Sequence, residues 1–302
     1  MWKEILSIIF IILFIIMVWI MIQKNMREIY VPENFENFTY ERGDNNDVKI
    51  LTYNIQNFPW SIKSLGDKKM IKLINDHSII LLQECFSEVY DSLEKYYPDY
   101  YICRGKLKGL NIMNSGLVIM SKFPIEKFGF TEYKTSNYWS FDYLCEKGFL
   151  VAVLNTGKEK IKIINTHLQS SDFERYDKSA VLQFNELKEY LKNLKKKGEK
   201  YIVGGDFNID INDLEKIDKI KDLEIRSPRD PTIFIDLSTA RTSSSKVDTY
   251  EPFIFDYFIT HLNLNDEDRD EKIDKDIKDI KDIKVIKSDY SDHNPVSIKL
   301  NF

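Results

Sequence analysis

The sequence predicts one α/β domain, of the α/β or α+β class, preceded by a single membrane-spanning helix. Three observations indicate this: an uncharged apolar run near the N-terminus, an alternation of strand-like and helical segments after it, and a composition rich in bulky apolar residues. Of the 302 residues, 43% are hydrophobic and 30% are charged, with only 11 Gly and 8 Pro. This composition excludes a disordered or collagen-like chain.

The N-terminal run from Ile5 to Ile22 holds no charged residue, and Ser7 is its one clearly polar residue. A helix of this length spans roughly 27 Å, close to the thickness of a bilayer core. A cleaved signal peptide has a shorter apolar region and a small-residue exit, whereas this run ends through Trp19 and Met21. We therefore interpret residues 1–24 as a retained single-pass anchor, with removal as a signal the alternative.

The orientation of this anchor is left open by the charges around it, because Lys3 precedes it and Lys24 and Arg27 follow it. The chain has 3 Cys without CxxC spacing, which indicates neither a disulfide framework nor a zinc site. They are Cys85, Cys103 and Cys145. Sparse thiols favour a reducing compartment, so we place the main domain in the cytosol. A glycosylation sequon at Asn37 points the opposite way.

After a polar connector over 25–47, residues 48–302 suit a single domain with a packed core. Apolar runs typical of strands are Val48–Asn54, Ile79–Gln83, Gly116–Ser121, Phe149–Asn155, Ile161–His167, Tyr201–Gly205, Phe253–Thr260 and Val285–Ser288. Helical periodicity marks Lys68–Asp76 and Asp177–Lys197. Residues 266–287 repeat Lys-Asp-Ile with period three, which fits neither a helix face nor a strand face. We interpret them as a charged, solvated insertion whose Val285 end rejoins the sheet.

The charge balance argues against one class of partner. The net charge is −5, the wrong sign for a protein whose affinity rests on a broad phosphate-neutralising surface. The sequence therefore disfavours non-specific binding of nucleic acid, and it indicates no protein partner.

Polar side chains recur where the expected strands end, which is where a rigid scaffold presents catalytic groups. They are Asn54, Glu84, His167, Asp206, Asn208, Asp256, Asp292 and His293. A carboxylate after the apolar run that ends in Glu84 is costly unless a cation or metal accompanies it. Oxygen ligands such as Glu84 and Asn54 suit Mg²⁺, although Asn54 alone equally fits a turn cap.

A His-Asp pair can take a proton from an attacking water while the carboxylate fixes the imidazole tautomer. His293 fits this role because Asp292 abuts it and Asp256 ends a neighbouring expected strand. Neutral donors, Asn208 and His167, suit a pentavalent phosphoryl transition state. His77 and His261 are interpreted as ordinary hydrogen-bonded side chains. This set of groups matches the needs of phosphodiester hydrolysis without a Ser or Cys nucleophile.

Six segments in order along the chain resemble motifs of the endonuclease/exonuclease/phosphatase superfamily, which has the DNase I-like fold. They are TYNIQNF (52–58), LLQEC (81–85), THLQS (166–170), GGDFN (204–208), DYF (256–258) and SDHNPV (291–296). The resemblance implies a four-layer sandwich of two mixed β-sheets with helices outside. It also implies cleavage of phosphate esters that depends on Mg²⁺, or on Mn²⁺ in its place.

Carried over position by position, this resemblance implies particular roles. Glu84 is the principal metal ligand, with Asn54 beside it and Asp292 supporting the metal side. Asp206 and Asn208 organise the phosphate and the water. His293, oriented by Asp256, is the general base, and His167 contacts the phosphoryl group or assists the leaving oxygen. The choice between the aspartate and the histidine as the base stays open.

The middle of the chain is most similar to neutral sphingomyelinases. The carrying segments are NSGLVIMSKFPI (114–125) and DYLCEKGF (142–149), followed by the THLQ run. Asp142 and Lys147 resemble an aspartate-lysine pair that links loop position to activity in membrane-bound relatives, although a surface salt bridge is the plain alternative. The insertion and the single hydrophobic segment depart from the family pattern.

The leading hypothesis is therefore a membrane-anchored sphingomyelinase that hydrolyses sphingomyelin to ceramide and phosphocholine by in-line water attack. Its partners are a phospholipid or sphingolipid substrate and the bilayer, and tethering raises the effective concentration of that substrate. The alternatives are another Mg²⁺-dependent phosphoesterase, acting on a lysophospholipid, a phosphoinositide or nucleic acid, and a catalytically idle membrane scaffold.

Overall fold

The structure of the chain is a computed structural model. It describes residues 2–25, 28–32, 47–58, 64–86, 90–105, 111–136, 144–170, 178–217, 223–226, 228, 232–236, 250–262 and 280–301. Within these residues the strands form a seven-stranded, a six-stranded and a two-stranded sheet. Most of the connector 25–47, the sequon at Asn37, the side chain of Asp142 and residues 266–279 lie outside the described residues.

The seven-stranded sheet has the order β1-β4-β5-β3-β2-β15-β14. Its strands are β1 (Ile29–Tyr30), β2 (Asp47–Asn57), β3 (Ile79–Cys85), β4 (Tyr101–Arg104), β5 (Val118–Ser121), β14 (Ile280–Val285) and β15 (Val296–Asn301). The two central strands, β2 and β3, run parallel. Both faces of β3 are covered, because Ile79 and Leu81 pack between the two large sheets while Ile80 and Leu82 pack on the opposite face.

The six-stranded sheet has the order β10-β13-β9-β8-β7-β6. Its strands are β6 (Ile125–Glu132), β7 (Gly148–Asn155), β8 (Lys160–His167), β9 (Tyr201–Asp206), β10 (Glu224–Arg226) and β13 (Asp256–His261). The strands β8 and β9 are its parallel pair. The small ribbon consists of β11 (Ile233–Asp236) and β12 (Tyr250–Phe253).

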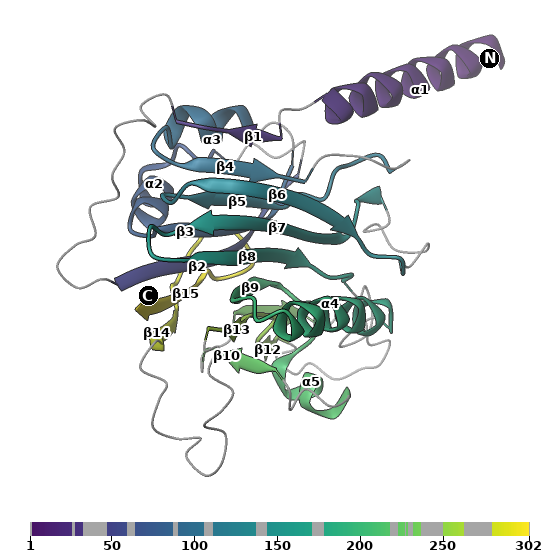
Figure 1. Cartoon of the computed structure of the whole chain (residues 1–302). Coiled ribbons are helices and arrows are strands. Elements are labelled where there is room, and N and C mark those ends of the chain that lie inside the picture. The colour runs from purple at the N-terminus through teal and green to yellow at the C-terminus, as the bar shows by residue number, and fades with distance from the viewer. Residues whose placement is uncertain are drawn as a thin grey trace.

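Helices cover the outer faces of both large sheets (Figure 1). They are α2 (Lys68–Asn75) and α3 (Tyr90–Tyr96) on the seven-stranded sheet, and α4 (Lys178–Lys196) and α5 (Ile211–Ile217) on the six-stranded sheet. The apolar face of α4 includes Phe184, Leu187 and Leu191 and packs on the six-stranded sheet, as its periodicity predicts. The predicted four-layer sandwich of two mixed sheets is confirmed.

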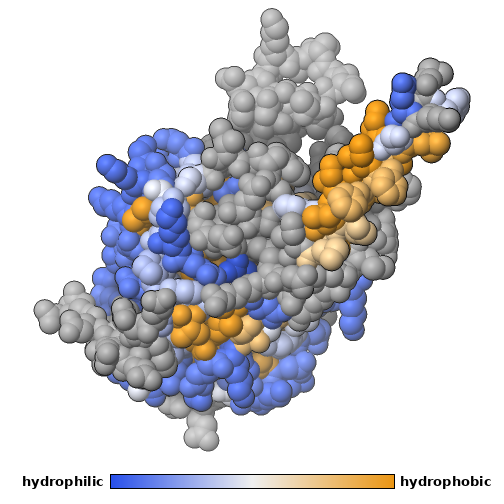
Figure 2. Space-filling view, turned by 90° about the horizontal axis from the view of Figure 1, so that it is seen from above, coloured by the Kyte–Doolittle hydropathy of each residue, from blue (hydrophilic) through white to orange (hydrophobic). Residues whose placement is uncertain are grey.

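The N-terminal helix α1 (Trp2–Asn25) projects from the domain next to β1 and α3 (Figure 1). Its window Glu4–Met21 has a mean hydropathy of 2.9, and none of that window is buried. Apolar side chains cover it in Figure 2. Among the described residues it is the one helix long and apolar enough to cross a membrane.

The region 266–287 is not wholly a solvated insertion, because residues 280–285 form the edge strand β14. A β-bulge between Ile280 and Asp282 explains why a period of three, which predicts no strand, is compatible with one here. Ile280 pairs with Leu300 and Ile283 pairs with Ile298, so positions three apart on β14 face positions two apart on β15. The expected strand Val285–Ser288 is therefore wrong in its bounds.

Other departures concern strand ends and short elements. The expected strand Phe253–Thr260 is divided, since β12 ends at Phe253 and β13 begins at Asp256. The edge strand β6 escaped recognition because its segment IEKFGFTE is largely exposed and carries charges and a glycine. Elements without a counterpart among the predicted segments are β1, β4, β6, β10, β11, β15, α3 and α5, while β12 shares only Phe253 and β14 only Val285 with one of them.

The buried His77 gives a prediction about stability. Its Nδ1 lies 2.7 Å from the Leu73 carbonyl oxygen and its Nε2 lies 2.8 Å from Ser297 Oγ. Burial lowers the pKa of His77 to about 4, against 6.5 for an exposed ring. Between pH 4 and pH 6.5 the unfolded chain therefore binds one more proton at His77 than the folded chain does. The contribution of neutral His77 to the unfolding free energy is complete above pH 6.5 and is lost as the pH falls toward 4. It amounts to about 3 kcal/mol.

We expect His77→Gln to be less stable than the wild type at pH 7 and to lose less of its unfolding free energy on acidification. Urea unfolding of both proteins at pH 7 and pH 4.5 measures the two slopes. Parallel pH dependences would contradict the assignment of a neutral His77 in the folded state.

Candidate active site

The expected site residues gather at one edge of the two facing sheets. Asn54 and Glu84 come from the parallel strands β2 and β3, while His167 and Asp206 come from the parallel strands β8 and β9. Parallel strands place their carboxyl ends at the same edge, which explains why polar residues distant in sequence meet here. We call this edge the catalytic edge.

Asn54 joins the two sheets. Its Nδ2 donates to Glu84 Oε1 and to Asp206 Oδ2, each at 2.9 Å. Its Oδ1 accepts the backbone N–H of Gln56 at 3.0 Å. Asn54 therefore holds two carboxylates side by side and, in this orientation, offers them its nitrogen rather than its oxygen. The sequence-based expectation that Asn54 supplies a metal-binding oxygen stays a prediction.

The backbone is strained at this edge. Among the described residues other than glycine, φ is positive at Gln56 (45°), Glu84 (50°) and Asn208 (49°), and all three are at or beside the site. A β-bulge between Asn54 and Asn57 accompanies the first of them. Left-handed conformations of this kind are unfavourable for residues with a Cβ and cluster at functional sites.

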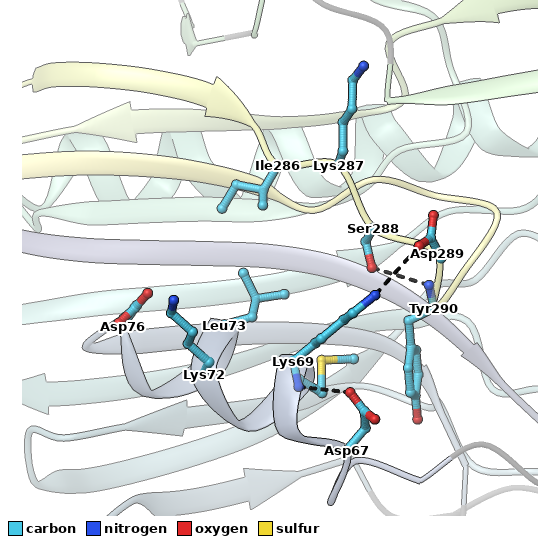
Figure 3. A pocket seen from close by; sticks show the side chains of 11 residues that line it. Asp67, Lys69, Lys72, Leu73, Asp76, Ile286, Lys287, Ser288, Asp289 and Tyr290 are labelled. Carbon is cyan, nitrogen blue, oxygen red and sulfur yellow. Dashed lines mark hydrogen bonds and ion pairs between the residues drawn. The ribbon is translucent and has the colours of Figure 1, made fainter.

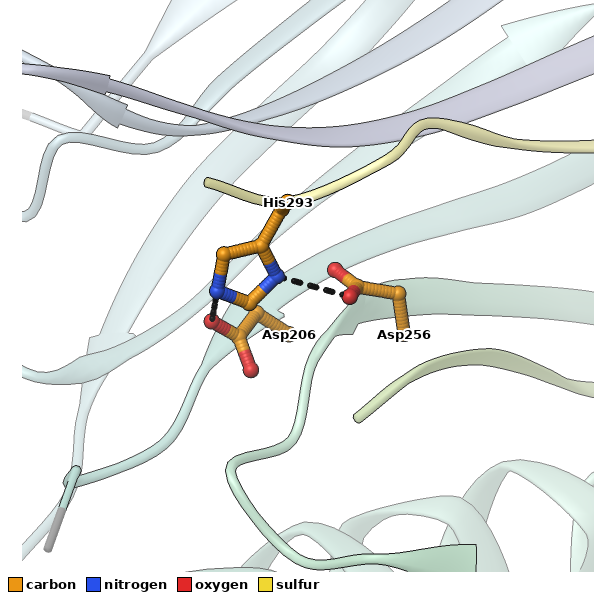
Figure 4. A group of neighbouring side chains, drawn as sticks. All are labelled: Asp206, Asp256 and His293. Carbon is orange, nitrogen blue, oxygen red and sulfur yellow. Dashed lines mark hydrogen bonds and ion pairs between the residues drawn. The ribbon is translucent and has the colours of Figure 1, made fainter. Parts of the chain in front are cut away.

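His293 lies between two carboxylates (Figure 4). Its Nδ1 is 2.8 Å from Asp256 Oδ2, and its Nε2 is 3.6 Å from Asp206 Oδ2. Burial alone would lower the pKa of His293, but the charges of Asp256 and Asp206 outweigh it and raise the pKa. Burial raises the pKa of Asp206 as well. Asp206 and His293 are both buried and therefore compete for one proton, as an acid-base pair does.

His167 lies near the carboxylates of Asp206 and Glu84. Its Nε2 lies 3.6 Å from Asp206 Oδ2 and 3.9 Å from Glu84 Oε1. Lys147 is buried, and its Nζ lies 3.3 Å from each His167 ring nitrogen and donates to the Leu168 carbonyl oxygen at 3.2 Å. Lys147 therefore touches a site residue, while Asp142, its expected partner, lies outside the described residues.

Two further expected residues, Asn208 and Asp292, lie at the margin of this cluster. The Asn208 Nδ2 donates to the Leu168 carbonyl oxygen at 3.0 Å, and its backbone N–H donates to Asp206 Oδ1 at 2.9 Å. Asp292 is exposed and accepts a hydrogen bond from Gln56 Nε2 at 3.0 Å. The structure thus places Asp292 beside Gln56 on the outer side of the cluster.

Sequence reasoning missed a buried amide network behind the site. The Gln83 Nε2 donates to Asn165 Oδ1 at 2.7 Å, and Asn165 Nδ2 donates to the carbonyl oxygens of Leu82 and Val118 at 2.7 and 2.8 Å. Gln83 precedes Glu84 and Asn165 lies two residues before His167, so their signal was a polar residue inside each apolar strand. This network fixes one sheet against the other.

The donor set fits a hard divalent cation. The carboxylates of Glu84 and Asp206 share one amide donor, and the Glu84 side chain is 16% exposed, so the pair borders solvent. Carboxylate oxygens are preferred ligands of Mg²⁺. Asp206, Asp256 and His293 also offer ligand atoms within 4.8 Å of one another. Within this group, His293 and Asp256 already hydrogen-bond each other.

A hollow of about 470 Å³ between α2 and residues 286–290 does not contain these groups (Figure 3). Lysines and aspartates border it in equal number, and an ion pair joins Lys69 to Asp289 at 3.8 Å. Because the hollow holds none of the expected site residues, we do not place the reacting phosphate there.

The fold and the site together are those of a family of proteins, and the sequence comparison names it. The chain belongs to the Endonuclease/Exonuclease/phosphatase family, whose model matches residues 51–293. The matched range contains all ten expected site residues.

Two curated relatives are sphingomyelinases from Leptospira interrogans. Sphingomyelinase C 2 of serovar Lai is 24% identical over 262 residues, covering 73% of this chain, and sphingomyelinase C 1 of serovar copenhageni is 29% identical over 244 residues, covering 70%. The matches cover 42% and 41% of those two relatives.

Solved structures share the fold at low identity. Beta toxin from Staphylococcus aureus superposes with a TM-score of 0.59 at 20% identity, covering 83% of this chain and 99% of the toxin chain. A variant of the same toxin was solved with bound magnesium ions. TDP2 from D. rerio, complexed with a single-stranded DNA product, superposes with a TM-score of 0.63 at 14% identity. The superposition covers 85% of this chain and 99% of the TDP2 chain. These likenesses show the fold.

Gly205 provides a test of how β9 positions Asp206. A Cβ at Gly205 would lie 2.1 Å from the Thr166 carbonyl oxygen of the neighbouring strand β8. Gly205→Ala therefore forces β8 and β9 apart, and we expect a loss of about 3 kcal/mol of unfolding free energy. Because Asp206 is the next residue, we also expect turnover to fall by about tenfold or more.

Gly129→Ala is the matched control, since nothing lies within 4 Å of the position that a Cβ would take at Gly129. Urea unfolding and turnover of both variants are the measurements. A Gly205→Ala protein with wild-type stability and turnover would contradict the packing argument.

Proposed function

We propose that this chain is a membrane-anchored, Mg²⁺-dependent phosphodiesterase that hydrolyses sphingomyelin to ceramide and phosphocholine. The observation that carries the proposal is the convergence on Asp206 Oδ2 of Asn54, His167 and His293, with Glu84 alongside. This arrangement surrounds one small volume with carboxylate, amide and imidazole groups, as hydrolysis of a phosphodiester requires. The names of the two curated relatives favour sphingomyelin as the substrate.

In the proposed reaction, Glu84 and Asp206 hold the cation. Bound there, Mg²⁺ neutralises charge that develops on the phosphoryl oxygens. His293 Nε2 takes a proton from the attacking water, and the water oxygen bonds to phosphorus as the bond to the ceramide oxygen breaks. Asp256, held 2.8 Å from Nδ1, stabilises the resulting imidazolium. The departing oxygen takes up a proton, so charge and atoms balance.

The remaining residues have positioning and donor roles in this proposal. The NH₂ group of Asn208 has two hydrogens, and with one on the Leu168 carbonyl oxygen the other is directed to a phosphoryl oxygen. His167 contacts the phosphoryl group or protonates the leaving oxygen, and Lys147 fixes its ring. Asp292 keeps Gln56 in place at the rim.

The anchor is part of the proposal. The helix α1 is apolar on all sides and is not buried against the domain, so it is not a core helix. A retained anchor places this apolar surface in the bilayer, away from water. Cleavage as a signal would instead remove the helix from the mature chain. Placement of the domain in the cytosol remains a proposal that rests on the three buried cysteines, none of which is in a disulfide.

The test uses the full chain reconstituted in mixed micelles. Sphingomyelin, phosphatidylcholine, a lysophospholipid and plasmid DNA are each assayed with Mg²⁺ and with EDTA. We expect Mg²⁺-dependent release of phosphocholine from sphingomyelin well above turnover of the other substrates. Faster cleavage of DNA would favour an activity of the kind that the TDP2 likeness suggests. No turnover by a folded chain on any substrate would favour the idle scaffold.

A further inference from the structure

We propose that the short strand β1 holds the catalytic edge of the domain against the bilayer in which α1 is embedded. This inference rests on the anchor proposed above and adds an orientation to it. The interaction surface is the catalytic edge, and its partner is the lipid surface around α1.

The first step is the attachment of β1 to the domain. The strand pairs with β4, with Ile29 opposite Cys103 and Tyr30 opposite Ile102. The backbone N–H of Arg104 donates to the Glu28 carbonyl oxygen at 3.0 Å, and the Tyr30 hydroxyl donates to the Pro98 carbonyl oxygen at 3.3 Å. The chain is therefore fixed to the sheet from Glu28 onward.

The second step is the length of chain between helix and sheet. The helix α1 ends at Asn25, so only residues 26 and 27 separate it from Glu28. Three Cα–Cα steps span at most about 11 Å. Without the pairing of β1, residues 26–46 would join α1 to β2, and a linker of that length lets a domain tumble freely. Pairing of β1 thus confines the domain to the membrane surface.

The third step is the direction in which β1 enters the sheet. The strand β4 is antiparallel to β5, and β5 is antiparallel to β3, so β3 and β4 run the same way. Arg104 and Leu82 both pair with Val118, which places Glu28 almost level with the carboxyl end of β3. With strands about 4.8 Å apart, Glu28 lies about 16 Å from the backbone of Glu84. The membrane end of the chain therefore enters at the catalytic edge.

The fourth step is the contrast between the two ends of the domain. The catalytic edge carries an apolar cluster in which Phe58, Ile112 and Leu144 remain partly exposed around buried Phe86. The opposite edge, at the turn between β7 and β8, carries ion pairs between Lys160 and Glu126 and between Lys162 and Glu199. An apolar cluster near the bilayer and a charged surface far from it agree with this orientation.

The test measures orientation without using turnover. Full-length protein is reconstituted in phosphatidylcholine liposomes that contain headgroup spin-labelled lipid, and a fluorophore is attached to a single introduced cysteine. Asp289→Cys places it at the catalytic edge and Lys158→Cys places it at the opposite edge. The native cysteines are buried and react slowly. We expect the spin-labelled lipid to quench the fluorophore at position 289 and not to quench the fluorophore at position 158.

The strand itself is tested by Tyr30→Pro, which removes a strand N–H and the hydroxyl that bonds Pro98. Val31→Pro, one residue beyond the strand, is the matched control. We expect Tyr30→Pro to abolish the difference between the two labels and to lower turnover of bilayer substrate, with turnover of a water-soluble phosphodiester unchanged. We expect Val31→Pro to behave as the wild type.

Flotation of the liposomes separates the two proposals. A chain that fails to float with liposomes overturns the anchor and this inference together. A chain that floats but is quenched equally at both positions overturns only the orientation, as does a Tyr30→Pro protein that keeps the wild-type difference.

Discussion

His293→Ala lowers kcat for phosphodiester hydrolysis by about 10³-fold or more in the folded protein, as the expected result of removing the proposed base. The physical reason is the position of the ring: Nδ1 is 2.8 Å from Asp256 and Nε2 is 3.6 Å from Asp206, so the ring can take the proton of the water while Asp256 stabilises the imidazolium that forms. KM changes less than kcat, because the imidazole acts on the water rather than on the substrate lipid.

The cost in stability is limited by Asp206. Without the imidazole ring, Asp206 and Asp256 face each other in a buried setting, and in the absence of the cation the pKa of Asp206, which burial already raises, lets it take up a proton. Circular dichroism and urea unfolding check that the variant is folded. His77→Gln, a change at a buried histidine outside the site, is the control and keeps its kcat. Turnover within about tenfold of the wild type in folded His293→Ala would sink the assignment of the base.

The catalytic edge was predictable from the sequence because its residues end apolar strands. Glu84, His167 and Asp206 each follow a buried run, and the parallel pairing of these strands brings such ends together. The four layers were implied by the resemblance to the family, since the alternation of apolar strands and helices by itself predicts only an α/β or α+β domain.

Contacts between side chains were less predictable. Nothing in the local pattern indicates that Asn54 presents its nitrogen to two carboxylates, because that orientation depends on the backbone N–H of Gln56 at a bulge. The contact of Lys147 with His167 depends on Gly148 lying opposite His167 in the sheet. Register and bulges arise from long-range pairing, and a single sequence carries only a weak signal of them.

The same limit explains why β1 and β14 were missed. Both are edge strands without a long apolar run: β1 has only two residues, and three of the six residues of β14 are charged. Their roles differ. The strand β14 extends the sheet beyond β15, whereas β1 sets the distance between the proposed anchor and the site.

Glu84→Gln is expected to raise the Mg²⁺ concentration needed for half-maximal turnover by about 10-fold to 100-fold and to lower kcat at saturating Mg²⁺. Glutamine keeps the shape of the side chain and an oxygen that accepts from Asn54 Nδ2, so the bridge between the sheets persists. What is lost is one negative charge beside Asp206, and a hard cation binds a neutral amide oxygen more weakly than a carboxylate.

Two measurements separate this loss of charge from a structural defect: isothermal titration of Mg²⁺ binding, and turnover as a function of Mg²⁺ concentration. Glu126→Gln is the control, since it removes a carboxylate that pairs with Lys160 at the opposite edge and should leave both curves unchanged. Weakened binding in Glu84→Gln together with wild-type unfolding free energy assigns the cation to the pair formed by Glu84 and Asp206. Equal Mg²⁺ affinity in Glu84→Gln and the wild type would instead move the cation to the group formed by Asp206, Asp256 and His293, where protonation of His293 would compete with it.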